Sequence, residues 1–405
     1  MNREKSNVDI GESLEVEENV RLLEEKVENL SLEEGVICEG SEHLCNNCTE
    51  EAQDEEIVTD KERDAFLMLH FNENSFMKSS VQFNLESDIN SGKQFKDKAT
   101  QVCTDDFTFS FISLINSDKV LNTLTGIPTL SLLEALVESA KKVWPNRRHG
   151  KHVLSLKESI VLTMLKIKQD LSYSMFFALF QKVGRHTCSR VFNTTVLLLS
   201  TILTPIVARW PSREEIDNNN LPNYFHEFKP TRVVLDCTET PIEKSKCLRC
   251  RVRCYSQYKS TFTVKVLVGV TPAGLISYVS PTYGGRASDK QIFTDSELLN
   301  CITGGTDAVM VDKGFLIESL CVRHDIQLFR PPFMHDNQLN HDEAQFCKKI
   351  AAARVHVERV NQRIKFVKMV RSQFAWNLFD YMDHIFRIAC ALVNLSAPVL
   401  AENNF

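Results

Sequence analysis

The chain has 405 residues, 43% of them hydrophobic, which is enough for two or three domains of a soluble globular protein. Its opening MNREKSNVDI lacks the apolar core of a signal peptide. Its longest apolar run, at 196–210, is too short and too interrupted by Thr and Pro to predict a membrane span. We therefore expect no membrane partner, and the thirteen scattered cysteines are expected to be reduced thiols of the cytosol or nucleus.

Charge is distributed unevenly along the chain. Residues 1–60 contain 19 acidic and 4 basic residues, a net charge of −15, whereas the whole chain has −6, so residues 61–405 carry +9. A basic body suits a polyanionic partner, although many basic domains bind none. Residues 1–104 are acidic, rich in Asn and Ser and short of periodic apolar segments, which predicts a largely disordered region.

One stretch of this acidic region has a heptad-like rhythm of apolar residues: Val16, Val20, Leu23, Val27 and Leu30. Two heptads are marginal for a coiled coil, which usually has three or four. The stretch is compatible with self-association or with a transient amphipathic helix.

The pattern becomes helical over 105–210. Within it, helices are predicted at 155–168, 173–182 and 188–203, with a turn at Val183 and Gly184, a spacing compatible with a helix-turn-helix at about 154–205. The basic residues around it are Lys141, Lys142, Arg147, Arg148, Lys151, Lys182, Arg185 and Arg190. They indicate either DNA contact, in which Arg185 and Arg190 would take part, or a plain helical subdomain with a solvated charged face.

A mixed α/β sheet is predicted from about 225 to 396, because short β-branched runs alternate there with helical periods. The expected strands are 231–236, 263–270 and 275–280 (a hairpin through the turn 271–274), 308–312 and 326–330. The expected helices begin near Ser288, at about 315 and after Pro332, and a closing helix covers about 376–394.

Two of these strands end in an aspartate, VVLD at Asp236 and VMVD at Asp312. A carboxylate at the end of a buried strand emerges at the edge where α/β sheets place their sites. If the strands are neighbours, the two carboxylates repel each other, and divalent cations relieve the repulsion. Hard oxygen ligands of this kind suit Mg²⁺ or Mn²⁺.

A later helix carries a glutamate beside its apolar stripe. The stripe is Phe346, Ile350, Ala353, Val357, Val360, Ile364 and Val367, and Glu358 lies about 100° round from Val357, at the edge of the buried face. A lone glutamate there is usually solvated or salt-bridged. It can also be a third carboxylate of a two-metal site, which stabilises both oxygens of an in-line phosphoryl displacement.

Several blocks of the sequence resemble a known family: LDCTETPIE, YSQYKSTFTVKVLVGVTPAGLISYVSPTYGGRASDKQI, VMVDKGF and ARVHVERVNQRIKF. In this order they are similar to DDE-superfamily transposase endonucleases of the Harbinger type, over about 225–370 and more loosely at 154–205. The resemblance implies an RNase H-like fold with Asp236 and Asp312 on adjacent strands and Glu358 on a late helix. It further implies two divalent cations, Mg²⁺ or Mn²⁺, bound by these three catalytic residues.

The resemblance also implies partners and a location. DNA is the expected substrate, a separate DNA-binding subunit is a possible requirement, and two DNA ends call for a homo-oligomer. The nucleus is inferred from the substrate, with the cytoplasm as a second location, and KKVWPNRRHGK is a weak import motif.

Residues near the acidic triad are candidate DNA-backbone contacts: Arg354, Gln362 and Lys365 on the same helix, and Lys259, Lys265 and Lys313 elsewhere. Arg354 can alternatively pair with Glu358 at the surface. Lys313 stands in VDKGF where the family usually has arginine, which keeps the charge but loses bidentate phosphate geometry. Asp289 is either an accessory carboxylate near the metals or a helix cap.

Zinc is not expected. Relatives from animals often begin with a THAP zinc domain, but here only the isolated pair Cys45 and Cys48 is present in the acidic region. Cys247, Cys250 and Cys254 are denser, yet no histidine accompanies them. We interpret them as part of a basic loop over the active site.

The sequence therefore predicts a metal-dependent DNA endonuclease or transposase-like nuclease. The main alternative is a domesticated descendant that binds DNA or chromatin and no longer cleaves. The acidic tail and the missing zinc domain favour the descendant, whereas the intact acidic triad favours the enzyme.

Overall fold

A computed structural model of the protein describes residues 111–143, 154–181, 183–219, 221–333 and 340–400. The predictions for residues 1–104, for Cys45 and Cys48, and for the basic residues of 144–153 lie outside these described residues. The described residues from 111 onward belong to one compact unit.

The first part of this unit is helical. Its elements are η3 (Phe111–Leu114), α3 (Asp118–Thr125), α4 (Leu130–Val143), α5 (Leu156–Gln169), α6 (Tyr173–Phe180), α7 (Arg185–Val207), α8 (Arg213–Asn219) and η4 (Asn223–Phe228). The three predicted helices are confirmed as α5, α6 and α7. Ser155 and Glu158 form a capping box that begins α5, and Asp170, at φ 53°, ends it.

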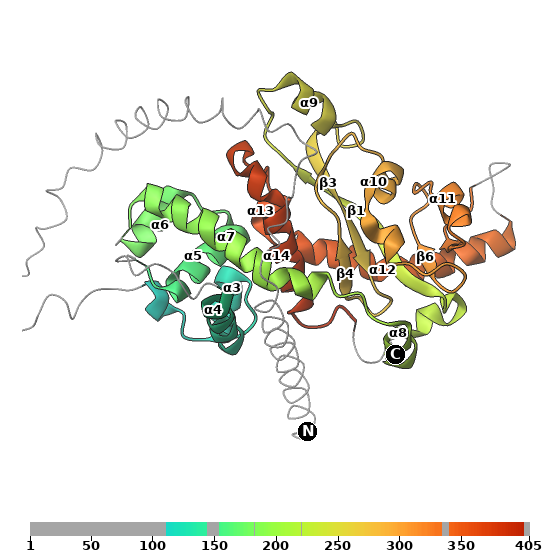
Figure 1. The fold of residues 1–405 in the computed structure, drawn as a ribbon, viewed down its shortest axis with the longest axis horizontal. Helices are drawn as coiled ribbons and strands as arrows, with labels where there is room; N and C mark the ends of the chain where they lie inside the picture. Colours follow the sequence, from blue (N-terminus) through green and yellow to red (C-terminus); the bar gives the residue numbers. More distant parts are fainter. Residues whose placement is uncertain (1–110, 144–153, 182, 220, 334–339, 401–405) are drawn as a thin grey trace, which may run out of the picture. The chain divides into compact units, whose positions relative to one another are not determined.

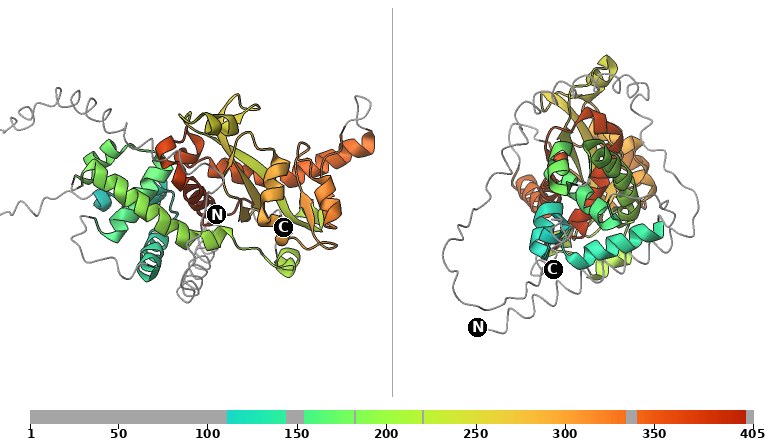
Figure 2. Two further views of the ribbon diagram at one scale, coloured as in Figure 1. Left: turned by 45° about the horizontal axis from the view of Figure 1, so that its top comes forward. Right: turned by 90° about the vertical axis from the view of Figure 1, so that its left-hand side faces the viewer.

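Helix α7 continues through Pro205 into its last turn, so the apolar run that includes Leu198 and Ile202 is part of a 23-residue helix. By length and composition this helix could cross a membrane, which the shorter run alone did not suggest. Half of its most apolar window is buried inside the protein, where it packs on α5 and α14, as in the core helix of a soluble protein. Figures 1 and 2 show α7 beside α14.

The second part of the unit is α/β. Its strands are β1 (Thr231–Pro241), β2 (Tyr255–Ser256), β3 (Thr261–Val270), β4 (Ile276–Val279), β5 (Tyr283–Gly284), β6 (Ala308–Met310) and β7 (Gln327–Phe329). Its helices are α9 (Leu248–Cys254), α10 (Asp289–Asp295), η5 (Glu297–Asn300), α11 (Glu318–Arg323), α12 (His341–Ile364), α13 (Lys368–Arg371), η6 (Trp376–Tyr381) and α14 (Met382–Asn394).

The sheet is mixed. β3 lies between β1 and the short strands β2, β4 and β5, all antiparallel to it, while β1, β6 and β7 run parallel in that order. The predicted hairpin is confirmed as β3–β4, and its turn uses Gly274 at φ 94°, a conformation that glycine adopts freely. This sheet with helices on both faces is compatible with an RNase H-like core.

Alternating residues of the strands enter two different cores. Val234 and Met310 pack with α12 and α14, in a core that continues into the helical part of the chain. Val233 and Val309 point the other way, toward α10 and α11. We call these the α12 face and the α10 face of the sheet; Figure 1 shows the helices about the strands.

The predicted stripe of α12 is buried with one exception. Ile350, Ala353, Val357, Val360 and Ile364 are each 0% exposed. Phe346, which the stripe also included, is 38% exposed and contacts Phe228 with tilted rings, so the buried face begins one turn later than expected.

Candidate active site

Asp236 on β1 lies level with Asp312, which follows the end of the neighbouring strand β6. β1 and β6 are parallel, with Val234 opposite Met310, and Asp236 and Asp312 each follow two residues later. Asp236 shares a face of β1 with Val234, and Asp312 is paired with Arg354 of α12, so both aspartates belong to the α12 face. The expected adjacency of the two strands is therefore confirmed.

Helix α12 contacts both aspartates through one strip of its surface. Nδ2 of Asn361 donates a hydrogen bond to Oδ2 of Asp236 at 2.7 Å, and Nη1 of Arg354 pairs with Oδ1 of Asp312 at 2.9 Å. Glu358 is four residues after Arg354 and three before Asn361, so it lies on the same strip. Its side chain is exposed in this structure.

The Asp236 carboxyl is a perturbed acid. Its pKa is raised from 3.8 to about 6: burial is the largest cause, the negative charges of Asp312 and Asp289 also raise it, and the Arg354 guanidinium and the Asn361 hydrogen bond lower it. Asp312 is exposed and accepts a second hydrogen bond from the backbone N–H of Lys313, at 2.6 Å. The Asp236 carboxyl is thus desolvated, while the Asp312 carboxylate is solvated and ion-paired.

The donor atoms at this edge suit a hard cation. The Oδ1 atom of Asn361 is buried without a hydrogen-bond partner in the structure, and it belongs to the amide that contacts Asp236. Two carboxylates and an unused amide oxygen are ligands that Mg²⁺ and Mn²⁺ accept. Within the described residues, no three His, Cys, Asp or Glu side chains form a group that could hold a metal ion.

Asn361 is a site residue that the sequence interpretation missed, since it named Gln362 instead. Gln362 is exposed, whereas Asn361 is 8% exposed and touches Asp236. Its spacing of seven residues from Arg354 and three from Glu358 was the pattern that could have identified it.

Asp289 and Lys265 lie on the opposite face of β1. Lys265 pairs across the strands with Glu239, and its ammonium is 3.7 Å from that carboxylate, 3.3 Å from Asp289 and 3.1 Å from the carbonyl of Ala287. With its side chain 14% exposed, Lys265 is engaged within the protein, and its predicted DNA contact gains no support.

The cap of α10 is the neighbouring residue. Ser288 accepts the hydrogen bond from the backbone of Gln291, and Asp289 is the first residue of the helix. Of the two candidate caps, Ser288 is confirmed and Asp289 is wrong. Its charge still raises the pKa of Asp236, so it lies within electrostatic reach of the site.

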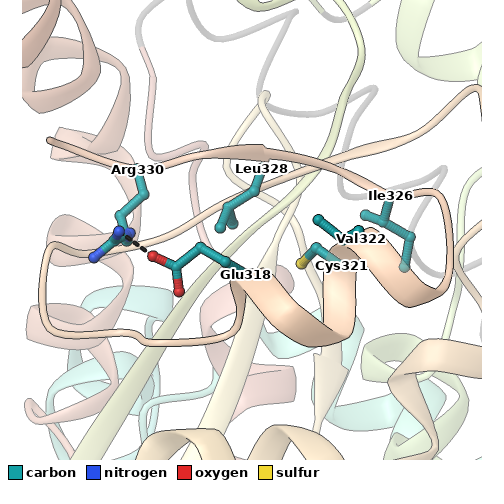
Figure 3. A pocket seen from close by; sticks show the side chains of 6 residues that line it. All are labelled: Glu318, Cys321, Val322, Ile326, Leu328 and Arg330. Carbon is teal, nitrogen blue, oxygen red and sulfur yellow. Dashed lines mark ion pairs between the residues drawn. The ribbon is translucent and has the colours of Figure 1, made fainter.

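Arg330 holds the loop that follows Asp312. Its Nη1 donates to the carbonyl of Lys313 at 3.0 Å, and it pairs with Glu318 at the start of α11 (Figure 3). The shallow hollow in Figure 3 is lined by Glu318, Cys321, Val322, Ile326, Leu328 and Arg330, so it belongs to α11 and β7 and includes neither aspartate.

Comparison with known families gives a match to this region. Residues 235–394 match the family described as DDE superfamily endonuclease. The matched segment begins just before Asp236, ends with α14, and contains Asp312, Glu358 and Asn361. It supports a nuclease or transposase-like function, and a nuclease domain implies DNA as its substrate. A comparison with curated proteins found no match.

The remaining predicted DNA contacts of the endonuclease segment are more exposed. Lys259 and Gln362 are exposed, and Lys313 and Lys365 are half-buried. The Lys313 ammonium lies 5.8 Å from the ring centre of Phe333. In the helical region, Arg190 is exposed on α7, and Arg185 is half-buried at the first position of that helix.

The cysteine-rich segment forms a helix rather than the expected loop. Cys250 and Cys254, four residues apart on α9, are 2% and 1% exposed, and Cys247 is half-buried just before the helix. Burial raises the pKa of the Cys254 thiol to about 12, and the neighbouring Cys250 adds to the effect. The expectation that zinc does not bind here stays a prediction.

Proposed function

We propose that this chain is a Harbinger-type, metal-dependent DNA endonuclease that hydrolyses phosphodiester bonds with Asp236, Asp312 and Glu358. The observation that carries the proposal is the pair of level aspartates under one strip of α12, with Glu358 between the two residues that contact them. The family match at 235–394 supports the same conclusion.

Asp236, Asp312 and Glu358 would hold the divalent cations, Mg²⁺ or Mn²⁺, with the Asn361 amide oxygen as a further donor. Such cations, when bound, stabilise the attacking and leaving oxygens of an in-line displacement. Asn361 orients the Asp236 carboxylate through its N–H group. Arg354 is 8% exposed and its guanidinium is paired with Asp312, not with Glu358, so its role is to position that carboxylate rather than to contact the DNA backbone.

The proposal includes partners. Helix α7 packs on both α5 and α6, which supports a helix-turn-helix role for about 154–205, with Arg190 exposed for DNA. A homo-oligomer, a separate DNA-binding subunit and a nuclear location complete the proposal, because cutting two DNA ends needs two active sites and the substrate is nuclear.

A second candidate function is DNA or chromatin binding without cleavage. The ion pair between Arg354 and Asp312 favours it, because this guanidinium neutralises one of the two metal-binding carboxylates from within the protein. The exposed position of Glu358 favours it as well.

Nicking of supercoiled plasmid in Mn²⁺ distinguishes the two functions. We expect nicking by the wild type that requires the metal and falls by at least about 10³-fold in each of Asp236→Asn, Asp312→Asn and Glu358→Gln. Asp289→Asn, on the opposite face of β1, is the matched control and should stay within about tenfold of wild type.

Nicking that persists in the three variants would point to a contaminant and refute the assignment. If the wild type binds DNA and Mn²⁺ does not elicit nicking, the non-cleaving descendant is the correct function.

A further inference from the structure

Residues 242–260, which join β1 to β3, form a strongly basic segment that we call the basic tip. It contains one acidic residue, Glu243, and six basic ones, Lys244, Lys246, Arg249, Arg251, Arg253 and Lys259, a net charge of +5 in a chain of net charge −6. All six except Arg251 are exposed. Arg251 instead donates two hydrogen bonds to the carbonyls of Ser245 and Lys246, each at 2.7 Å.

The basic tip is anchored to the sheet. The buried thiols of Cys250 and Cys254 fix one side of α9, and the backbone N–H of Arg286 donates to the carbonyl of Arg253 at 3.1 Å. Gly284 passes so close that a Cβ there would lie 2.4 Å from the same carbonyl oxygen, a contact that only glycine permits. Arg249 and Arg253 are therefore presented from a fixed helix, and Lys244, Lys246 and Lys259 flank it.

Exposed apolar side chains are interleaved with these cations. Leu248 is 70% exposed, Tyr255 41% and Tyr258 83%. The Lys259 ammonium lies 4.7 Å from the centre of the Tyr258 ring, which holds a cation over an aromatic face. A net charge of +5 on such an exposed surface suits the phosphate backbone of a nucleic acid.

The position of the basic tip favours DNA over an acidic protein. β1 carries Asp236 and continues for five residues to Pro241, so about 17 Å of strand separates the aspartate from the tip. This is less than one turn of duplex, about 34 Å. Figure 1 shows α9 at the end of the paired strands β1 and β3.

We propose that the basic tip binds the phosphate backbone of the duplex that flanks the bond at Asp236 and Asp312. This inference rests on the proposed function, because it takes DNA as the substrate of the neighbouring site. The tip adds affinity and register on the duplex, and it takes no part in the chemistry.

The test is duplex binding by the full chain in chelator, measured by fluorescence anisotropy between about 50 and 200 mM salt. The variant combines Lys244→Gln, Arg249→Gln and Lys259→Gln. The control combines Lys119→Gln, Arg323→Gln and Lys348→Gln, three exposed cations elsewhere with the same total charge change. We expect the tip variant to bind at least about tenfold more weakly at 150 mM salt, with a salt slope smaller by about 2 to 3.

The control should stay within about threefold of wild type. A tip variant that binds like the control would overturn the inference and leave the endonuclease proposal intact. If the wild type binds no duplex even at low salt, both proposals fail.

A photocrosslinker identifies directly what binds to the basic tip. A benzophenone amino acid in place of Tyr258, which is 83% exposed, should crosslink to the duplex, and one in place of Val322, 80% exposed, should not. Crosslinks from position 258 to the chain's own acidic residues 1–60, in the presence of DNA, would identify an internal occupant and overturn the inference.

Discussion

The carboxylates on the two faces of β1 have different partners. On the α10 face, Glu239 accepts a hydrogen bond from Thr263 at 2.8 Å and shares the Lys265 ammonium with Asp289. On the α12 face, Asp236 accepts one hydrogen bond from the neutral amide of Asn361, and the nearest guanidinium is paired with Asp312.

The difference separates structural from functional carboxylates. The acids of the α10 face already have a cation from the protein itself. The pKa of Asp236 is raised to about 6, chiefly by burial, which means that the folded protein holds its carboxylate at an energetic cost. Groups perturbed in this way cluster at functional sites, where a bound cation compensates them.

Removing Lys265 should cause the largest loss of stability on the α10 face. Lys265→Met leaves Glu239, whose side chain is 9% exposed, with only the Thr263 hydroxyl as partner. We expect a loss of about 3 kcal/mol in the free energy of unfolding, measured by urea denaturation. Lys259→Met removes an exposed lysine of the basic tip and should change the free energy of unfolding by no more than about 0.5 kcal/mol. A loss below about 1 kcal/mol for Lys265→Met would show that the lysine is not needed there.

Neutralising Asp236 should raise the free energy of unfolding rather than lower it. Its pKa is raised from 3.8 to about 6 in the folded protein, so its contribution to stability is fully present below pH 3.8 and is lost as pH rises through 6. In chelator at pH 8, Asp236→Asn should therefore be more stable than wild type by on the order of 2 kcal/mol, and the gain should vanish near pH 4.

Asp289→Asn provides the contrast at pH 8. It loses an ion pair with Lys265, so we expect it to be destabilised by up to about 1 kcal/mol. If Asp236→Asn and Asp289→Asn both destabilise the metal-free protein, the distinction between the two faces is wrong.

The main features of the sheet and of α12 were predictable because they depend on local periodicity. Short β-branched runs before Asp236 and Asp312 indicated buried strands, and the four–three spacing around Val357 fixed the buried side of the helix. The role of Asn361 was not predictable in this way, because it depends on how α12 is rotated over the sheet.

Non-local pairing explains the other differences. Lys265 meets Glu239 and Asp289 only once β1, β3 and α10 are assembled, and nothing in its local sequence indicates an internal partner. The boundary between the helical and α/β regions was predicted where helical periodicity gives way to short β-branched runs. The core crosses it, because α7 packs on α14.

Calorimetric titration with Mn²⁺ at about pH 7.5 tests the assignment of the α12 face most directly. We predict that wild type and Asp289→Asn bind the metal with affinities within about threefold of each other, and that Asp236→Asn abolishes binding. Metal binding that survives Asp236→Asn, or that depends on Asp289 instead, would contradict the assignment of this face as the metal site.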